Sequence, residues 1–244
     1  MTESILARYP SFLTIPMARL FEPNSPLAHL ETLRKLIESL LAFLNFTFIQ
    51  TYMFFGTRSP KGDQVVMECL KSHLVGSNAV RSLHHLSLII KNVAGTDSFF
   101  TFGLSRAITE SGDNNPLLPL KELWEFLQTP QDPLEENLPA AVAALPQIMV
   151  SFKGFLQNAI VMKNLPGARE AFFDLTGPHA GPLKPADWPG LDLPPGEIII
   201  LSKDRSEALG LFPYFTFGGE HITFAVPDKK LIAILYERLE LKGS

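Results

Sequence analysis

The sequence predicts an α+β protein in which an N-terminal helical layer packs on a small C-terminal antiparallel β-meander. Up to about residue 162, apolar residues recur with the 3.6-residue period of amphipathic helices. The segment 211–226 instead reads LFPYFTFGGEHITFAV, two strand-forming runs separated by a Gly-Gly pair, which is typical of a hairpin with a two-residue turn. One face of this hairpin is apolar, so we expect the helices to cover it.

The composition narrows the class of protein. The chain has 244 residues, of which 46% are hydrophobic and 19% charged, a balance that supports a substantial buried core. Its net charge is −4 and its lysines and arginines form no cluster, which argues against a nucleic-acid partner. Cys69 is the only cysteine, so an intramolecular disulfide is excluded and a cytoplasmic location is expected. The first residues lack the basic region and apolar run of a secretory signal.

We expect a single domain with three parts. Residues 1–162 form the mainly helical part, 163–196 an extended Pro/Gly-rich linker, and 197–241 the antiparallel sheet. Within the helical part, the prolines of residues 1–24 exclude a long helix and predict an irregular arm that packs along the surface.

The longest predicted helix covers residues 26–55. Asn24 or Ser25 caps it, and Pro26 suits its first turn. Its first half is amphipathic, whereas its second half is apolar on nearly every face, which predicts a position at the centre of the helical layer. The uncharged stretch 40–55 is shorter than the ~20 residues that cross a bilayer, so we interpret it as a core helix and not as a membrane span.

Shorter elements follow. We expect a loop at 56–62, and the four clearer helical segments are 63–75, 78–93, 120–128 and 134–162, the last interrupted by Pro139 and Pro146. Residues 99–108 fit either a short strand or a helix. The sheet is predicted to begin with a strand at 197–202 and a polar turn at 203–207. Residues 231–241 favour a third strand of the meander over a terminal helix.

The hairpin turn fixes a predicted strand register. With Gly218-Gly219 as the turn, Phe217 faces Glu220 and Phe215 faces Ile222. The apolar face then carries Leu211, Pro213, Phe215, Phe217, Ile222, Phe224 and Val226. The opposite, more polar face carries Phe212, Tyr214, Thr216, His221, Thr223 and Ala225.

Four residues of the polar face are the predicted interaction site: Tyr214, Thr216, His221 and Thr223. Small polar and aromatic groups of this kind suit a recognition surface. The alternative is the ordinary solvated face of an antiparallel sheet, which has the same composition.

No sequence motif indicates a chemistry. Phosphate-binding glycine loops and a G-x-S-x-G nucleophile motif are absent from the sequence. Cys69 and His73 share a predicted helix face and His84-His85 follow, but their spacing departs from known zinc sites, and we interpret them as a half-buried thiol and surface histidines. We therefore predict no catalytic residue, cofactor or metal. The carboxylates most open to a catalytic interpretation, which we assign to solvated helix faces, are Glu122, Glu125, Glu135 and Glu136.

A succession of motifs in the C-terminal third resembles a known kind of protein region. Phe172-Phe173-Asp174-Leu175-Thr176-Gly177 is followed by a Pro-rich linker, a GEIIIL segment and an L-x-P-[FY] core. With the leucine-rich helix near residue 40, this order is similar to uncharacterised N-terminal accessory regions of bacterial multidomain signalling and defence-type proteins. The resemblance implies a module that senses, docks or oligomerises, and it transfers no catalytic residue.

These observations lead to three functional hypotheses. The first is a non-enzymatic regulatory or protein-interaction module of a bacterial multidomain system, whose partner is another protein, further domains of a longer chain, or a second copy. The second is a sensor that binds an apolar small molecule between the helices and the Phe-rich sheet. The third is an enzyme of unrecognised type.

Overall fold

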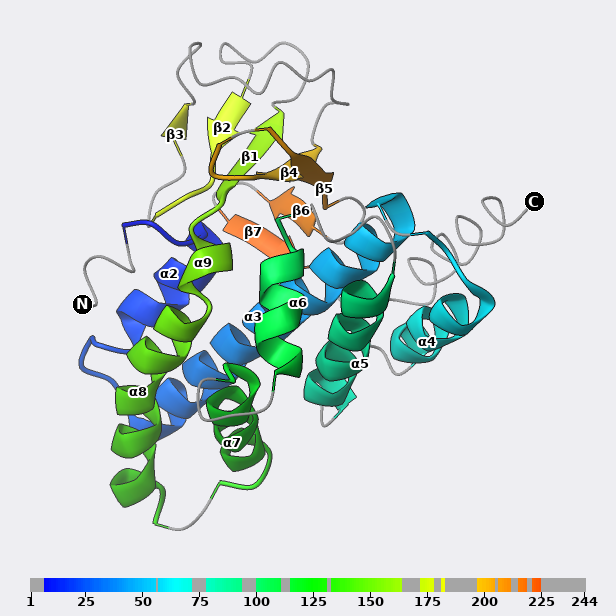
Figure 1. The fold of residues 1–244 in the computed structure, drawn as a ribbon. Helices are drawn as coiled ribbons and strands as arrows, with labels where there is room; N and C mark the ends of the chain where they lie inside the picture. The colour runs from blue at the N-terminus through cyan, green and yellow to red at the C-terminus, as the bar shows by residue number, and fades with distance from the viewer. Residues whose placement is uncertain are drawn as a thin grey trace.

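The computed structural model confirms an α+β fold, with a helical layer beneath an antiparallel sheet (Figure 1). The structure describes residues 7–55, 57–71, 78–93, 100–110, 115–130, 133–163, 172–177, 181–182, 197–204, 206–211, 215–218 and 221–224. The predicted third strand or helix at 231–241 lies outside these residues.

The first described helix, α2 (Ser11–Arg19), occupies the segment predicted to be irregular. That prediction was wrong because its prolines are tolerated: Pro10 stands at the N-cap, and Pro16 removes a single backbone donor from a short helix. Phe12, Leu13 and Met17 are buried, and α2 packs on α3. Their burial, worth about 1.5–3 kcal/mol for each side chain, outweighs the lost hydrogen bond.

The central helix is α3 (Pro26–Phe55), with the bounds that the sequence predicts. The Ser25 hydroxyl accepts a hydrogen bond from the Ala28 N–H at 3.3 Å, which satisfies one free donor of the first turn. By length and composition α3 would suffice to cross a bilayer, and 83% of its most apolar 18-residue window is buried inside the fold.

The polar side chains in the apolar half of α3 are buried and hydrogen-bonded. The Asn45 amide donates to the carbonyl oxygen of Ala79 at 3.0 Å, which ties α3 to the start of α5 (Asn78–Asn92). The hydroxyls of Thr51 and Thr101 are 3.1 Å apart and tie α3 to the start of α6 (Phe102–Thr109). These contacts fix how the neighbouring helices sit on α3, because an apolar contact alone allows them to slide.

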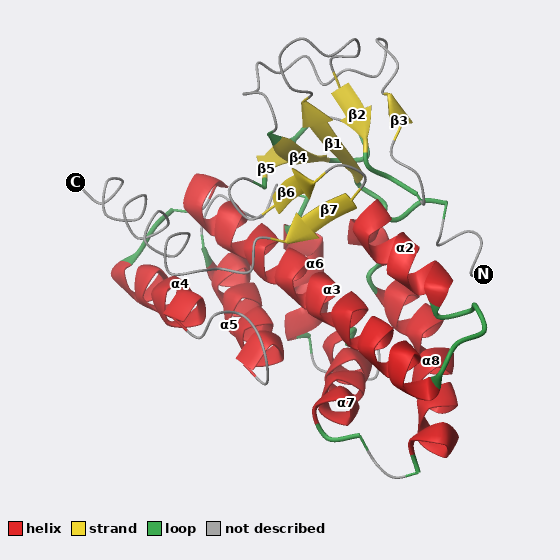
Figure 2. Cartoon of the chain, turned by 180° about the vertical axis from the view of Figure 1, so that it is seen from behind, coloured by secondary structure: helices red, strands yellow, loops and turns green. Residues whose placement is uncertain are grey.

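The remaining helices complete the helical layer (Figures 1 and 2). They are α4 (Pro60–Lys71), α5 (Asn78–Asn92), α6 (Phe102–Thr109), α7 (Leu117–Gln128), α8 (Leu134–Ser151) and α9 (Lys153–Leu156). Helices α5, α7 and α8 pack on α3, whereas α4 and α6 pack mainly on α5, and α9 follows α8. The sequence of residues 99–108 fits either a strand or a helix, and the structure forms helix α6 there. Helix α4 begins three residues earlier than predicted, and α8 runs through both Pro139 and Pro146.

The five-stranded sheet has the antiparallel order β3-β2-β1-β4-β5. Its strands are β1 (Ala159–Lys163), β2 (Phe172–Asp174), β3 (Gly181–Pro182), β4 (Ile198–Leu201) and β5 (Ala208–Gly210). The central strand β1 was predicted as the end of a helix, because a short apolar run buried on both faces has no period that separates strand from helix. Strands β2 and β3 lie in the stretch predicted as an irregular linker.

The predicted hairpin is present as β6 (Phe215–Gly218) and β7 (His221–Phe224), beside α2 and between the helices and the larger sheet (Figures 1 and 2). Its register differs from the prediction. Phe215 pairs with Phe224 and Gly218 with His221, so residues 219 and 220 separate the strands in place of Gly218-Gly219. The observed register matches aromatic with apolar positions, whereas the predicted one opposes Phe217 to Glu220. Because the shift is two residues, the paired positions 215–218 and 221–224 keep their predicted faces.

Candidate functional site

The backbone register brings together three of the four residues predicted as an interaction face. Thr216 lies directly opposite Thr223, and His221 lies opposite Gly218, two positions along the same ladder. Strand alternation therefore puts these positions on one face of the hairpin. Tyr214 falls outside the described residues.

The cysteine and histidines do not form a metal or nucleophile site in the described part of the chain. Cys69 is 4% exposed, and its thiol points to the Ser82 carbonyl oxygen at 4.0 Å. Burial raises the pKa of this thiol, which disfavours the reactive thiolate. His73 falls outside the described residues, and the described residues contain no group of three His, Cys, Asp or Glu side chains that could hold a metal ion.

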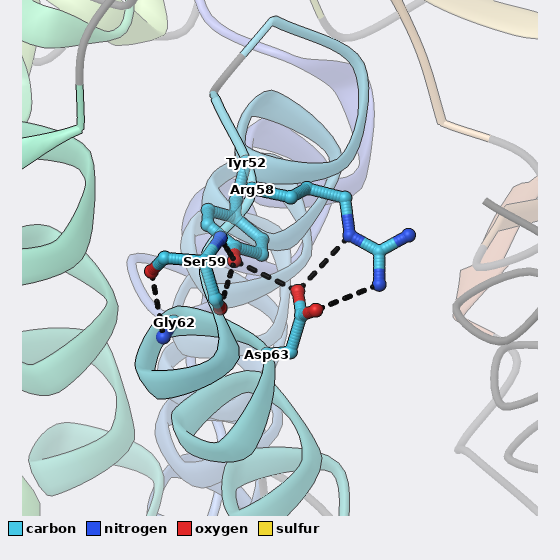
Figure 3. A network of polar contacts seen from close by, with 5 residues as sticks. All are labelled: Tyr52, Arg58, Ser59, Gly62 and Asp63. Atoms are coloured by element: carbon cyan, nitrogen blue, oxygen red, sulfur yellow. Dashed lines mark hydrogen bonds and ion pairs between the residues drawn. The ribbon is translucent and has the colours of Figure 1, made fainter. Parts of the chain in front are cut away.

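A polar network joins the end of α3 to the start of α4 (Figure 3). The Tyr52 hydroxyl donates to Asp63 Oδ1 at 2.8 Å and accepts from the Ser59 N–H at 3.0 Å. Arg58 donates to the same carboxylate through Nε at 3.0 Å and Nη2 at 2.9 Å. Ser59 caps α4 by accepting from the Gly62 N–H at 3.1 Å.

The Tyr52 hydroxyl and the Asp63 carboxylate are engaged within this network, whereas Nη1 of Arg58 is buried without a hydrogen-bond partner among the described residues. Burial opposes ionisation of Asp63, but the hydrogen bonds from Arg58 and Tyr52 outweigh it and keep the pKa of the carboxyl below its ordinary value. Burial also raises the pKa of Tyr52. Both oxygens of the Asp63 carboxylate accept hydrogen bonds, which fix this side chain between α3 and α4. The Ser-Pro pair at 59–60, a cap followed by proline, was the sequence signal for this earlier helix start.

A groove of about 580 Å³ lies where the end of α2 and the start of α3 meet α8. We call it the α3–α8 groove, and it is lined by Leu20, Phe21, Asn24, Pro26, His29, Glu135, Leu138, Pro139, Val142 and Ala143. Phe21 is 51% exposed at its edge. Phe21 therefore adds exposed apolar area to the groove.

The outer face of α8 continues this groove. It exposes Pro139, Ala140, Ala143, Ala144, Gln147 and Val150, which we call the α8 face. These positions recur every three to four residues and so form one stripe along the helix. The stripe contains no charged residue, whereas the solvent face of a surface helix normally carries several. The signal is visible in the sequence, because no charged residue occurs from 137 to 152.

Charged residues border the two ends of the α8 face. Glu135 and Glu136 are exposed in the first turn of α8, and Lys153 is exposed just after its last turn. Glu135 and Lys153 are 18 positions apart, or five turns of a helix with 3.6 residues in each, and α9 continues the line of α8 (Figure 1). The two opposite charges therefore lie at opposite ends of the α8 face.

A second groove, of about 540 Å³, separates α5 from α7. We call it the α5–α7 groove, and it is lined by Val80, Arg81, His84, Asn115, Leu117, Leu118, Lys121, Trp124, Glu125, Gln128 and Thr129. Val80, Leu117 and Trp124 are buried and form its floor, whereas Arg81, Lys121 and Glu125 are exposed at its rim. Sequence reasoning missed this groove because the packing of two separate helices creates it.

Comparisons with known proteins identify no relative, since no family model, curated protein or solved structure matches this chain.

Proposed function

We propose that this chain is a non-enzymatic interaction module that pairs with a second copy of itself through the α8 face. The observation that carries the proposal is an uncharged, mainly apolar face on a surface helix, next to the α3–α8 groove and the exposed Phe21. Such a surface loses unfavourable contact with water when a partner covers it. A regulatory or docking role in a cytoplasmic, bacterial multidomain system, as the sequence resemblance implies, is compatible with self-association.

The charges at the ends of the face favour a second copy as the partner. In an antiparallel pair of α8 helices centred on Ala144, Glu135 of one copy stands beside Lys153 of the other, and the two-fold axis repeats the pair. Each exposed pair contributes only about 0.2–1 kcal/mol, so the apolar face supplies the affinity and the charges select the orientation. The alanines at the centre allow the two helices to approach closely.

A charge-swap experiment tests this pairing. Lys153→Glu and Glu135→Lys each replace two attractive charge pairs by two repulsive ones. Each variant alone should therefore have a lower dimer association constant than the wild type. Mixing the two variants should restore association, because both interfacial pairs of the mixed dimer are again of opposite charge. Analytical ultracentrifugation over a concentration series gives the association constants.

Lys61→Glu is the matched control, because it makes the same charge change at an exposed position on α4. It should leave the dimer constant unchanged. A wild-type chain that stays monomeric at every concentration contradicts the proposal. So does a mixture of the two variants that associates no better than either variant alone, with all proteins folded by circular dichroism.

A further inference from the structure

We infer that the α5–α7 groove binds an amphipathic organic anion, with its apolar body on the floor of the groove and its carboxylate or sulfonate at Arg81 and Lys121. This site is separate from the α8 face and does not depend on self-association.

The floor of the groove suits an apolar body of the size of one or two rings. Val80 and Leu117 are each 8% exposed and Trp124 is 2% exposed, so the groove lies directly over side chains that belong to the packed core. Leu118 is 49% exposed beside them, and a bound apolar group would shield it from water. A volume of about 540 Å³ lies within the range of small-molecule sites.

The rim supplies positive charge to the groove. Arg81 is exposed and has no ion-pair or hydrogen-bond partner within the described part of the chain. Lys121 reaches Glu125 at 3.6 Å, but both side chains are more than half exposed, so this pair is weak and exchangeable. Two cations therefore face one carboxylate in a chain whose net charge is −4.

The histidine of the groove adds polarity without charge. Burial, and then the neighbouring His85, lower the pKa of His84, so its imidazole is neutral at neutral pH. The preference for an anion then comes from the Arg81 guanidinium, which can hold a carboxylate or sulfonate through two parallel hydrogen bonds, and from Lys121.

Two dyes of similar shape test this inference. Anilinonaphthalene sulfonate has an aromatic body with one negative charge, and N-phenylnaphthylamine has nearly the same body without the charge. In a Trp188→Phe background Trp124 is the only tryptophan, so quenching of its fluorescence reports binding near the groove. We expect the anionic dye to bind more tightly, and its affinity to fall as salt is added.

Arg81→Gln should weaken binding of the anionic dye about tenfold, the effect of one charge-assisted hydrogen-bonding group, and should leave binding of the neutral dye unchanged. Lys91→Gln, at an exposed position on α5 that does not line the groove, is the matched control and should change neither affinity. Leu118→Glu should weaken the binding of both dyes.

Two results would overturn the inference. One is equal affinity of the two dyes together with no effect of Arg81→Gln on the anionic one. The other is binding of the anionic dye without quenching of Trp124, which would place the dye elsewhere on the chain. Neither result bears on the α8 charge swap, so the two proposals fail independently.

Discussion

Gly62 lets the start of α4 approach α3 closely. A Cβ at this position would lie 2.5 Å from the Tyr52 hydroxyl and 2.8 Å from two ring carbons. Real Cβ atoms do not approach other atoms so closely. Tyr52 cannot move away without losing the hydrogen bonds that its hydroxyl makes with Ser59 and Asp63.

We therefore expect Gly62→Ala to destabilise the protein by about 1–3 kcal/mol, because overpacking outweighs the roughly 1 kcal/mol that alanine gains over glycine in a helix. Urea denaturation followed by far-ultraviolet circular dichroism measures the change. Gly103→Ala in α6 is the matched control, because its Cβ meets nothing within 4 Å, and this variant should be slightly stabilised. The loss of unfolding free energy caused by Gly62→Ala should be smaller in a Tyr52→Phe background, because that substitution removes the nearest atom. An equal loss in both backgrounds would contradict this explanation.

At the scale of elements, the segment that leads into α2 is pinned at several points. The Tyr9 hydroxyl donates to the Met149 carbonyl oxygen at 3.1 Å, in the last turn of α8. The Tyr9 carbonyl oxygen accepts from the Gly177 N–H at 2.7 Å, and the Ser11 N–H donates to the Leu175 carbonyl oxygen at 2.9 Å. Gly177 has a φ of 80°, which glycine adopts without strain. Helix α2 is thereby held between α8 and the end of β2.

This arrangement predicts a loss of stability at alkaline pH. Burial raises the pKa of Tyr9 from 10.0 to about 12. The unfolded chain therefore releases this proton first, and the stabilising contribution of Tyr9 is complete below pH 10 and declines as the pH rises toward 12.

Tyr9→Phe should cost about 0.5–1.5 kcal/mol at neutral pH through the lost hydrogen bond. The difference in unfolding free energy between the wild type and this variant should narrow between pH 10 and pH 12, the range between the two pKa values of Tyr9. Urea titrations at each pH provide the comparison. A difference that stays constant up to pH 12 would show that Tyr9 does not titrate as its burial requires.

The elements predicted well from the sequence are those with local signals at both ends. Helix α3 has a serine cap and a long apolar period, and its bounds were predicted correctly. Strand β1 was missed because its structure depends on β2 and β4, which come later in the chain. The hairpin was found from its two glycines, but its register depends on which cross-strand pairs pack best.

The candidate surfaces were less predictable than the fold. The uncharged run 137–152 is visible in the sequence, but its alternation of buried and exposed positions requires knowing which side of α8 meets α3. The α5–α7 groove and the Tyr52 network join residues from separate elements, and no local pattern encodes such contacts. The interaction face predicted on the hairpin stays a prediction.

At the scale of the whole molecule, one carboxylate joins the sheet to the helical layer. Glu207 precedes β5, and its Oε2 accepts a hydrogen bond from the Phe100 N–H at 2.9 Å, just before α6. The Glu207 N–H in turn donates to the Ser202 hydroxyl at 3.0 Å, which holds the turn between β4 and β5 in shape.

Glu207→Ala leaves the Phe100 N–H without this acceptor and should cost about 1–3 kcal/mol of unfolding free energy. Because the contact joins the two layers, the loss should appear in a single unfolding transition of the whole chain, measured together by circular dichroism and tryptophan fluorescence. Glu31→Ala, which removes an exposed ion pair with Lys35 on α3, should have a much smaller effect, because solvent screens this pair. Equal losses of unfolding free energy for the two substitutions would show that the Glu207 hydrogen bond does not stabilise the packing of the sheet on the helices.

The central place of β1 in the sheet also affects how the chain is made. During synthesis β1 leaves the ribosome directly after the helices, yet its neighbour β4 begins only at Ile198, some 35 residues later. At about 5–20 residues per second, this apolar strand waits for roughly 2–7 seconds with an open edge. The nascent protein is therefore most prone to aggregation, and most in need of a chaperone, after its helical layer has formed and before its sheet can close.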